Sequence, residues 1–186
     1  MTPFDQFRAA THCPFAQDST WTVSASPDQP VDAPEYLVRA REGLDRTSLD
    51  VREAAADGYV LRLPGAAGAS VDRLRATTLD VARHLAGPEV SYRELEDPAW
   101  WLPYGDDRYF LVAFGPCFPA THTRFTFAEP ETFLVFQHLR AFARRYPHGI
   151  PDGVRRGIKR RFAAAGRDYD YDMGAVPCAG AASASC

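Results

Sequence analysis

The sequence predicts an α+β fold: a single layered domain with a central, mostly antiparallel or mixed sheet flanked by helices. Three observations support this prediction. Two almost unbroken apolar runs, 108–114 and 132–137, are typical of central strands that are covered on both faces. Amphipathic helical patterns precede and follow these runs, as in layered domains. The 186 residues are enough for one domain with a sizeable core.

The first part of the chain alternates between helical and extended patterns. In chain order it predicts a helix at 2–11, a strand at 19–26, a helix at 34–44 and a strand at 59–65. Thr2 suits the N-cap of the first helix, and Pro3 suits its first turn. We expect the second helix to stop near Gly43, while residues 46–58 favour no single structure.

The clearest helix spans 70–87. Ser70 offers an N-cap, apolar residues recur at helical spacing, and Gly87 follows the end. Residues 88–107 predict a polar and aromatic loop before the first central strand. After the second central strand, helices are expected at 139–146 and 150–166.

Composition and charge are those of a soluble protein. Charged residues make up 24% of the chain and the formal net charge is −3, which argues against a general nucleic-acid binder. No apolar run is long enough to cross a bilayer, and the N-terminus lacks the pattern of a secretory signal. We therefore expect a cytoplasmic protein without a membrane partner, with its cysteines reduced. We expect one domain at 1–173 and a flexible tail at 174–186.

The segment between the two central strands, 115–125, has the sequence GPCFPATHTRF and concentrates reactive side chains. An imidazole can bind a metal or act as a base, and flanking strands can hold such a turn in place. If the segment is extended, His122 and Arg124 point to the same side and could hold an iron and a carboxylate. The alternatives are a histidine that hydrogen-bonds to backbone in its turn and an arginine that is only solvated. Cys117 is a candidate ligand or, more commonly, a small buried hydrophobe.

Further candidates lie outside this turn. Cys13 is a second potential thiolate ligand, and His138, at the end of the second central strand, could face the same cavity as the turn. Aromatic residues stand beside carboxylates in the loop before the first central strand, a combination that suits a cationic ligand. The group contains Trp100, Trp101, Tyr104, Asp106 and Asp107, with Glu94 and Glu96 just upstream, and its candidate substrate-binding residues are Trp101, Tyr104, Asp106 and Asp107. The alternative is a set of core aromatic residues flanked by solvated acids.

Several short motifs occur in a characteristic order: HCPFAQDSTW, PYGDDRYFLVAF, PATHTRF, TFLVFQHLRAF, VRRGIKRR and DYD. They cover residues 12–22 and, more fully, 100–172. This order resembles the YqcI/YcgG family, whose members carry a Phe-Pro-Cys-type motif near the N-terminus, a Pro-Ala-His turn with a downstream Arg, and a strand that ends in Gln. This chain has His-Cys-Pro at the first motif and one extra residue, Thr121, in the histidine turn. Some members are haem-dependent oxygenases that hydroxylate a nitrogen, notably the guanidino nitrogen of arginine.

The resemblance implies a haem b enzyme that hydroxylates a nitrogen of a small amine or guanidine in a biosynthetic pathway. His122 would be the axial iron ligand, with Cys13 as the alternative, and Arg124 would lie near a propionate or take part in the reaction. The other residues expected at the haem or in the reaction are Cys117, Phe114, Phe136 and His138. The expected partners are a small amine or amino acid, O2 and an electron donor, with a homodimer left open. Two alternatives stay open: a haem enzyme of another nitrogen chemistry, such as N–N bond formation or dehydration, and a ligand-binding module without catalysis.

Overall fold

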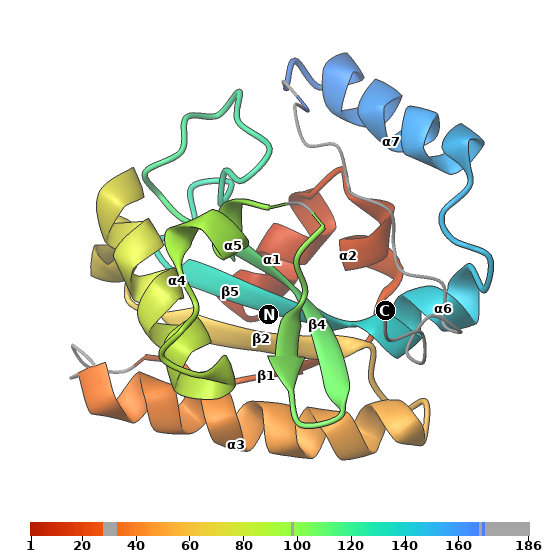
Figure 1. Cartoon of the computed structure of the whole chain (residues 1–186). Helices are drawn as coiled ribbons and strands as arrows, with labels where there is room; N and C mark the ends of the chain where they lie inside the picture. Colours follow the sequence, from red (N-terminus) through yellow and green to blue (C-terminus); the bar gives the residue numbers. More distant parts are fainter. Residues whose placement is uncertain (28–32, 98, 168, 170–186) are drawn as a thin grey trace.

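A five-stranded mixed sheet forms the centre of the structure, with its strands in the order β1-β2-β5-β4-β3 (Figure 1). The computed structural model describes residues 1–27, 33–97, 99–167 and 169. The strands are β1 (Trp21–Val23), β2 (Gly58–Leu63), β3 (Leu102–Tyr104), β4 (Asp107–Phe114) and β5 (Thr132–His138). β1 runs parallel to β2, and the other neighbours pair antiparallel. The predicted α+β class is confirmed; the tail expected at 174–186 lies outside the described residues.

Helices pack on both faces of this sheet. They are α1 (Pro3–Ala10), α2 (Pro14–Asp18), α3 (Ala33–Arg52), α4 (Val71–Ala86), α5 (Tyr92–Glu96), α6 (Leu139–Arg145) and α7 (Asp152–Ala164), with a 3-10 turn η1 (Gly65–Gly68). In Figure 1 the long α3 runs below the sheet beside α4, and α1 lies behind the strands. Among the described residues, no helix combines the length and apolar character needed to cross a membrane.

The prediction of a helix that stops near Gly43 is wrong, because α3 continues through this glycine to Arg52. A β-carbon at position 43 would overlap the ring of Tyr59 on β2. The glycine therefore serves close packing of the helix on the sheet, at a cost in helix propensity of about 1 kcal/mol. Most of the stretch 46–58, which favoured no structure, belongs to the same helix, and the loop expected at 88–107 contains α5 and β3.

Side chains along the strands alternate between two cores, as the period of a β-strand requires. Under α3 and α4 the core contains Tyr59, Leu61, Tyr109, Leu134 and Phe136. On the opposite face, α1 supplies Phe4 and Phe7, which pack on Val60, Phe133 and Val135. A third cluster joins α2, α6 and α7 through Phe15, Trp101, Phe142, Ile158 and Phe162. With helices on both faces, every residue of β5 is buried, as predicted for a central strand.

β4 differs from β5 because it extends past its outer neighbour. β3 pairs only with residues 107–109, so residues 110–114 lie at an edge that no described strand covers. Phe110, Leu111 and Val112 are accordingly half-buried. β5 is therefore buried along its whole length, whereas β4 mixes buried residues with half-buried and exposed ones. The cavities described below open beside the free edge of β4.

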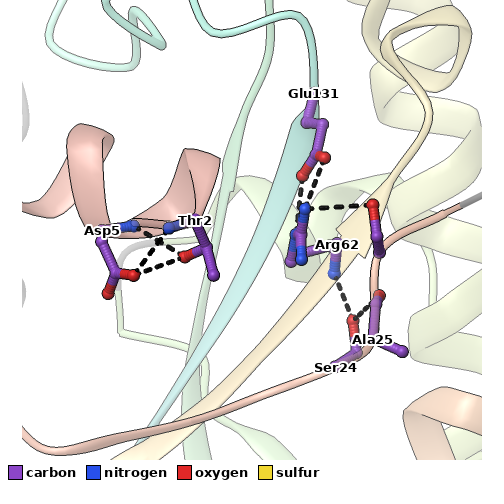
Figure 2. Close-up of polar contacts among 7 residues, drawn as sticks. Thr2, Asp5, Ser24, Ala25, Arg62 and Glu131 are labelled. Atoms are coloured by element: carbon purple, nitrogen blue, oxygen red, sulfur yellow. Dashed lines mark hydrogen bonds and ion pairs between the residues drawn. The ribbon is translucent and has the colours of Figure 1, made fainter.

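Two polar anchors fix the sheet and the N-terminal helix (Figure 2). Arg62 on β2 is 6% exposed and donates to both carboxylate oxygens of Glu131, at 2.7 and 2.6 Å. Its guanidinium also donates to Ser26, at 3.2 Å, which ties the chain after β1 to the same pair. Thr2 caps α1 as predicted: its hydroxyl accepts the amide proton of Asp5, whose carboxylate accepts the Thr2 amide proton at 2.9 Å.

Candidate functional site

A groove of about 480 Å³ lies beside the edge of β4. We call it the groove; its walls are α4, α5, residues 110–113 of β4 and the segment 118–124. The volume lies in the range of about 300–1,000 Å³ that is usual for small-molecule sites. Its apolar wall is made by Leu74, Leu95, Trp100, Phe110, Leu111 and Phe118. His122 and Arg124, both predicted from the sequence, line the groove as well.

Successive turns hold His122 at the groove. Its amide donates to the carbonyl oxygen of Pro119 at 2.8 Å, and its own carbonyl oxygen accepts from the amide of Phe125 at 3.2 Å. Its ring stacks on that of Phe118, with centroids 4.2 Å apart and planes 8° apart. Nδ1 of His122 accepts the amide proton of Arg124 at 3.0 Å. The hydrogen bond to backbone, considered from the sequence as the alternative role for this histidine, is therefore present.

This hydrogen bond determines which ring nitrogen carries the proton. Because Nδ1 of His122 is an acceptor, the proton of the neutral imidazole lies on Nε2. A histidine that binds iron through Nε2 usually carries its proton on Nδ1 and donates it to a second group. His122 could therefore ligate a metal through Nε2 only after its ring releases the Arg124 amide.

Charged side chains of both signs surround the groove. Arg75 of α4 forms an ion pair with Glu96 of α5, and its guanidinium carbon lies 5.0 Å from the ring centroid of Tyr92. Asp97 follows α5 and accepts the amide proton of Ala99 at 2.8 Å. With Arg124, the lining of the groove carries two cationic side chains, Arg75 and Arg124, and two acidic ones, Glu96 and Asp97. Such a site suits a ligand that has both an anionic and a cationic group.

A second, smaller cavity of about 90 Å³ lies on the other side of the β4 edge. Cys13, Phe114 and Arg124 line it, together with the rings of Phe15, Phe110, Phe142, Phe162 and Tyr169. Cys13 therefore does not face the groove with His122. Burial of the thiol raises the pKa of Cys13, which favours the neutral form and opposes a thiolate iron ligand.

Cys117 also lies away from the groove lining. It packs against the core under α3 and α4, and its amide donates to the carbonyl oxygen of Gly68 at 3.1 Å. Burial raises the pKa of Cys117 as well. Phe136 is fully buried in the same core. Neither residue lines the groove or the smaller cavity, so their predicted place beside a haem has no support in the described geometry.

His138 was expected to face the same cavity as His122, but it lies in the interior at 1% exposure. Its Nδ1 caps α6 by accepting the amide proton of Arg140 at 2.9 Å. Nε2 lies 3.0 Å from Oδ1 of Asp107, at ion-pair distance but without the alignment of a hydrogen bond. Burial is the main cause that lowers the pKa of His138, so the ring is neutral at neutral pH. The pair joins β4 to β5 and α6, which is a structural role.

The aromatic and acidic residues expected to bind substrate also lie elsewhere. Trp101 is buried in the cluster of α2, α6 and α7. The hydroxyl of Tyr104 donates to Asp45 at 2.5 Å, and Asp106 is exposed in the β3–β4 turn. Burial would raise the pKa of Asp107, but His138 and neighbouring groups hold it below its usual value. Glu94 accepts from the amide and hydroxyl of Ser91 in the cap of α5.

Sequence reasoning named Trp100 and Glu96 in this region but missed three other residues that line the groove: Arg75, Tyr92 and Asp97. The one available signal was the density of aromatic and acidic residues over 92–107, which identified the region but not every member. No group of three or more His, Cys, Asp or Glu in the described ranges could hold a metal ion. A haem iron, in contrast, takes only its axial ligands from the protein.

Comparison with known proteins gives no match: no family model fits the chain, and no curated protein or solved structure is significantly similar to it.

Proposed function

We propose that the protein is a haem-dependent enzyme that oxidises a nitrogen of a small cationic substrate bound in the groove. The observation that carries the proposal is that the Pro-Ala-His-type turn, on which the family resemblance depends, lines the groove of about 480 Å³. His122 and Arg124 meet there with an apolar wall from α4, α5 and β4. A haem bound in the groove would supply the oxygen activation that no side chain can provide.

The side chains have separate tasks in this proposal. His122 would hold the iron once its ring had left the Arg124 amide, and Arg124 would pair with a carboxylate of the haem or of the substrate. Glu96 and Asp97 orient the cationic nitrogen group, beside the rings of Tyr92 and Trp100. Leu74, Leu95 and Phe118 exclude water from the reacting atoms.

A hemin titration followed by visible absorption tests the proposal. The chain should take up one equivalent of hemin and give a Soret band. His122→Gln should lose or strongly shift that band, whereas His148→Gln, which changes an exposed histidine after α6, should not. A chain that stays colourless with excess hemin refutes the proposal, and an unchanged His122→Gln spectrum refutes His122 as the ligand.

The substrate part of the proposal has its own test. With reductant and O2, the hemin-loaded protein should add oxygen to an arginine-like amine, which mass spectrometry detects. Asp97→Asn should raise KM for such a cation with a smaller effect on kcat, because it weakens binding rather than oxygen activation. Equal KM values for the variant and the wild type would show that Asp97 does not orient the substrate.

A second candidate, a ligand-binding module without haem, is favoured by one observation. Since Nδ1 of His122 accepts the Arg124 amide, Nε2–H is a hydrogen-bond donor on the groove wall. Together with Arg124 it suits an anionic group of a zwitterionic ligand. The same titration separates the two candidates: this one predicts no Soret band, together with a thermal shift on addition of a zwitterionic amino acid.

A further inference from the structure

Arg167 reaches from the end of α7 to the segment that carries His122. Its Nη1 donates to the carbonyl oxygen of His122 at 3.4 Å. Its guanidinium carbon lies 4.1 Å from the ring centroid of Phe127 and 5.4 Å from that of Phe125. The residue is only 8% exposed, and a cation–π contact is strongest when it is shielded from water. The guanidinium therefore joins three residues of a single loop to a distant helix.

The end of α7 directs Arg167 toward this loop. Gly166 takes a left-handed conformation, with φ of 69°. The amide of Gly166 donates to the carbonyl oxygen of Ala163 and that of Arg167 to Phe162, both at 3.0 Å. These are the paired bonds of a glycine helix cap. The cap reverses the chain where the helix ends, so Arg167 lies against the loop that begins at His122.

The loop needs such a contact because its backbone is strained. Phe127 and Ala128 are consecutive left-handed residues, with φ of 57° and 65°, and neither is a glycine. Such conformations persist only where surrounding structure holds them. The Phe127 ring is held between the Arg167 cation and the rings of Phe7 and Phe125.

We propose that Arg167 is a positioning residue that binds the segment 122–127 and so holds His122 and Arg124 at the wall of the groove. We call its contacts with this segment the clasp. The clasp itself is independent of the bound ligand. Its consequence, that ligand affinity depends on Arg167, rests on the proposed function. No substrate contact is assigned to Arg167.

Limited trypsin digestion of the full chain tests the clasp, because the Arg124–Phe125 bond lies inside the clasped segment. Arg167→Met, which keeps an apolar chain but no cation, should speed cleavage at this bond about tenfold. Arg167→Lys should give a smaller increase, because a lysine keeps the charge but not the planar guanidinium. Arg145→Lys is the matched control, since Arg145 lies 5.9 Å from the ring of Phe15 on α2, and should leave the rate unchanged.

The buried Arg62–Leu63 bond in β2 reports on global unfolding in the same digest. A selective increase at Arg124–Phe125 supports the clasp. An equal increase in the cleavage rate at both bonds means that the variant unfolds as a whole. No increase at either bond means that the loop keeps its conformation without Arg167. Either result overturns the proposed role of Arg167.

A second readout follows the His122 ring directly. In wild-type protein, nitrogen NMR should give the Nε2-protonated tautomer for His122, and Arg167→Lys should shift its ring signals while those of buried His138 stay in place. Hemin affinity should then fall about tenfold in Arg167→Lys but not in Arg145→Lys. If wild-type protein binds no hemin, the proposed function fails while digestion and ring signals still decide the clasp. Unchanged ring signals in Arg167→Lys contradict it.

Discussion

Glu131→Gln should destabilise the protein far more than the loss of a surface carboxylate. The side chains of Arg62 and Glu131 are 7% and 12% exposed, and two hydrogen bonds of 2.6 and 2.7 Å join them. The substitution keeps the shape of the side chain but removes the negative charge. Arg62 then stays buried with no anion to balance it, in a setting where water cannot screen the charge.

The structure sets the size of this effect. Removal of one partner from a buried ion pair costs about 3–5 kcal/mol, whereas an exposed pair contributes about 0–1 kcal/mol. The retained amide oxygen of Gln and the Ser26 hydroxyl can each still accept one proton from Arg62, so we expect the lower end, about 3 kcal/mol. For a chain of this length that corresponds to a fall in Tm of roughly 6–12 °C.

Urea unfolding followed by tryptophan fluorescence measures the difference. Glu35→Gln is the matched control, because Glu35 pairs with Arg39 at 57% and 28% exposure. The double variant Arg62→Met/Glu131→Leu should recover most of the loss, since it removes the unbalanced charge. If Glu131→Gln costs no more than Glu35→Gln, the interpretation of this pair as a buried anchor is wrong.

Two further predictions concern pH and packing. The pKa values of His138 and Asp107 are both lowered in the folded protein, so the unfolded chain binds more protons in acid. The free energy of unfolding should therefore stay constant above about pH 6.5, the pKa of histidine in the unfolded chain, and fall at lower pH. Urea midpoints measured along the pH range test this. His138→Gln should make the free energy of unfolding depend less steeply on pH in that range. Gly43→Ala should cost about 1–3 kcal/mol because its methyl group meets Tyr59, whereas Gly153→Ala, at an open position in α7, should be neutral or stabilising, as thermal unfolding will show.

The elements that depend on local pattern were predictable from the sequence, and the exceptions have tertiary causes. Ser70 caps α4 as its position suggested, and the apolar run of β5 is a buried central strand. Gly43 suggested a helix end because glycine has low helix propensity, but Tyr59, which lies across the layer, requires the small residue there.

The candidate site was predictable only in its turn. His122 and Arg124 line the groove because both belong to the segment that follows the exposed edge of β4. The rest of the lining was predicted only in part, for a reason that Trp100 and Trp101 illustrate. Neighbours in an extended chain point to opposite sides, so Trp100 lines the groove while Trp101 enters the cluster of α2, α6 and α7. The composition of such a stretch identifies the region but does not show which of the two adjacent rings lines the groove.

The two His-x-Arg sequences show why a local motif does not determine a function. In both, Nδ1 of the histidine accepts the amide proton of the arginine two residues on, at 3.0 Å for His122 and 2.9 Å for His138. Both rings therefore have the same tautomer preference, with the proton on Nε2. Around His138 the interior is closed, and Asp107 occupies the position opposite Nε2, so the ring holds a strand to a helix. His122 is half-buried and lines a cavity large enough for a ligand. The different surroundings of the two histidines therefore arise from what the fold places around each ring, and not from the residues beside it in sequence.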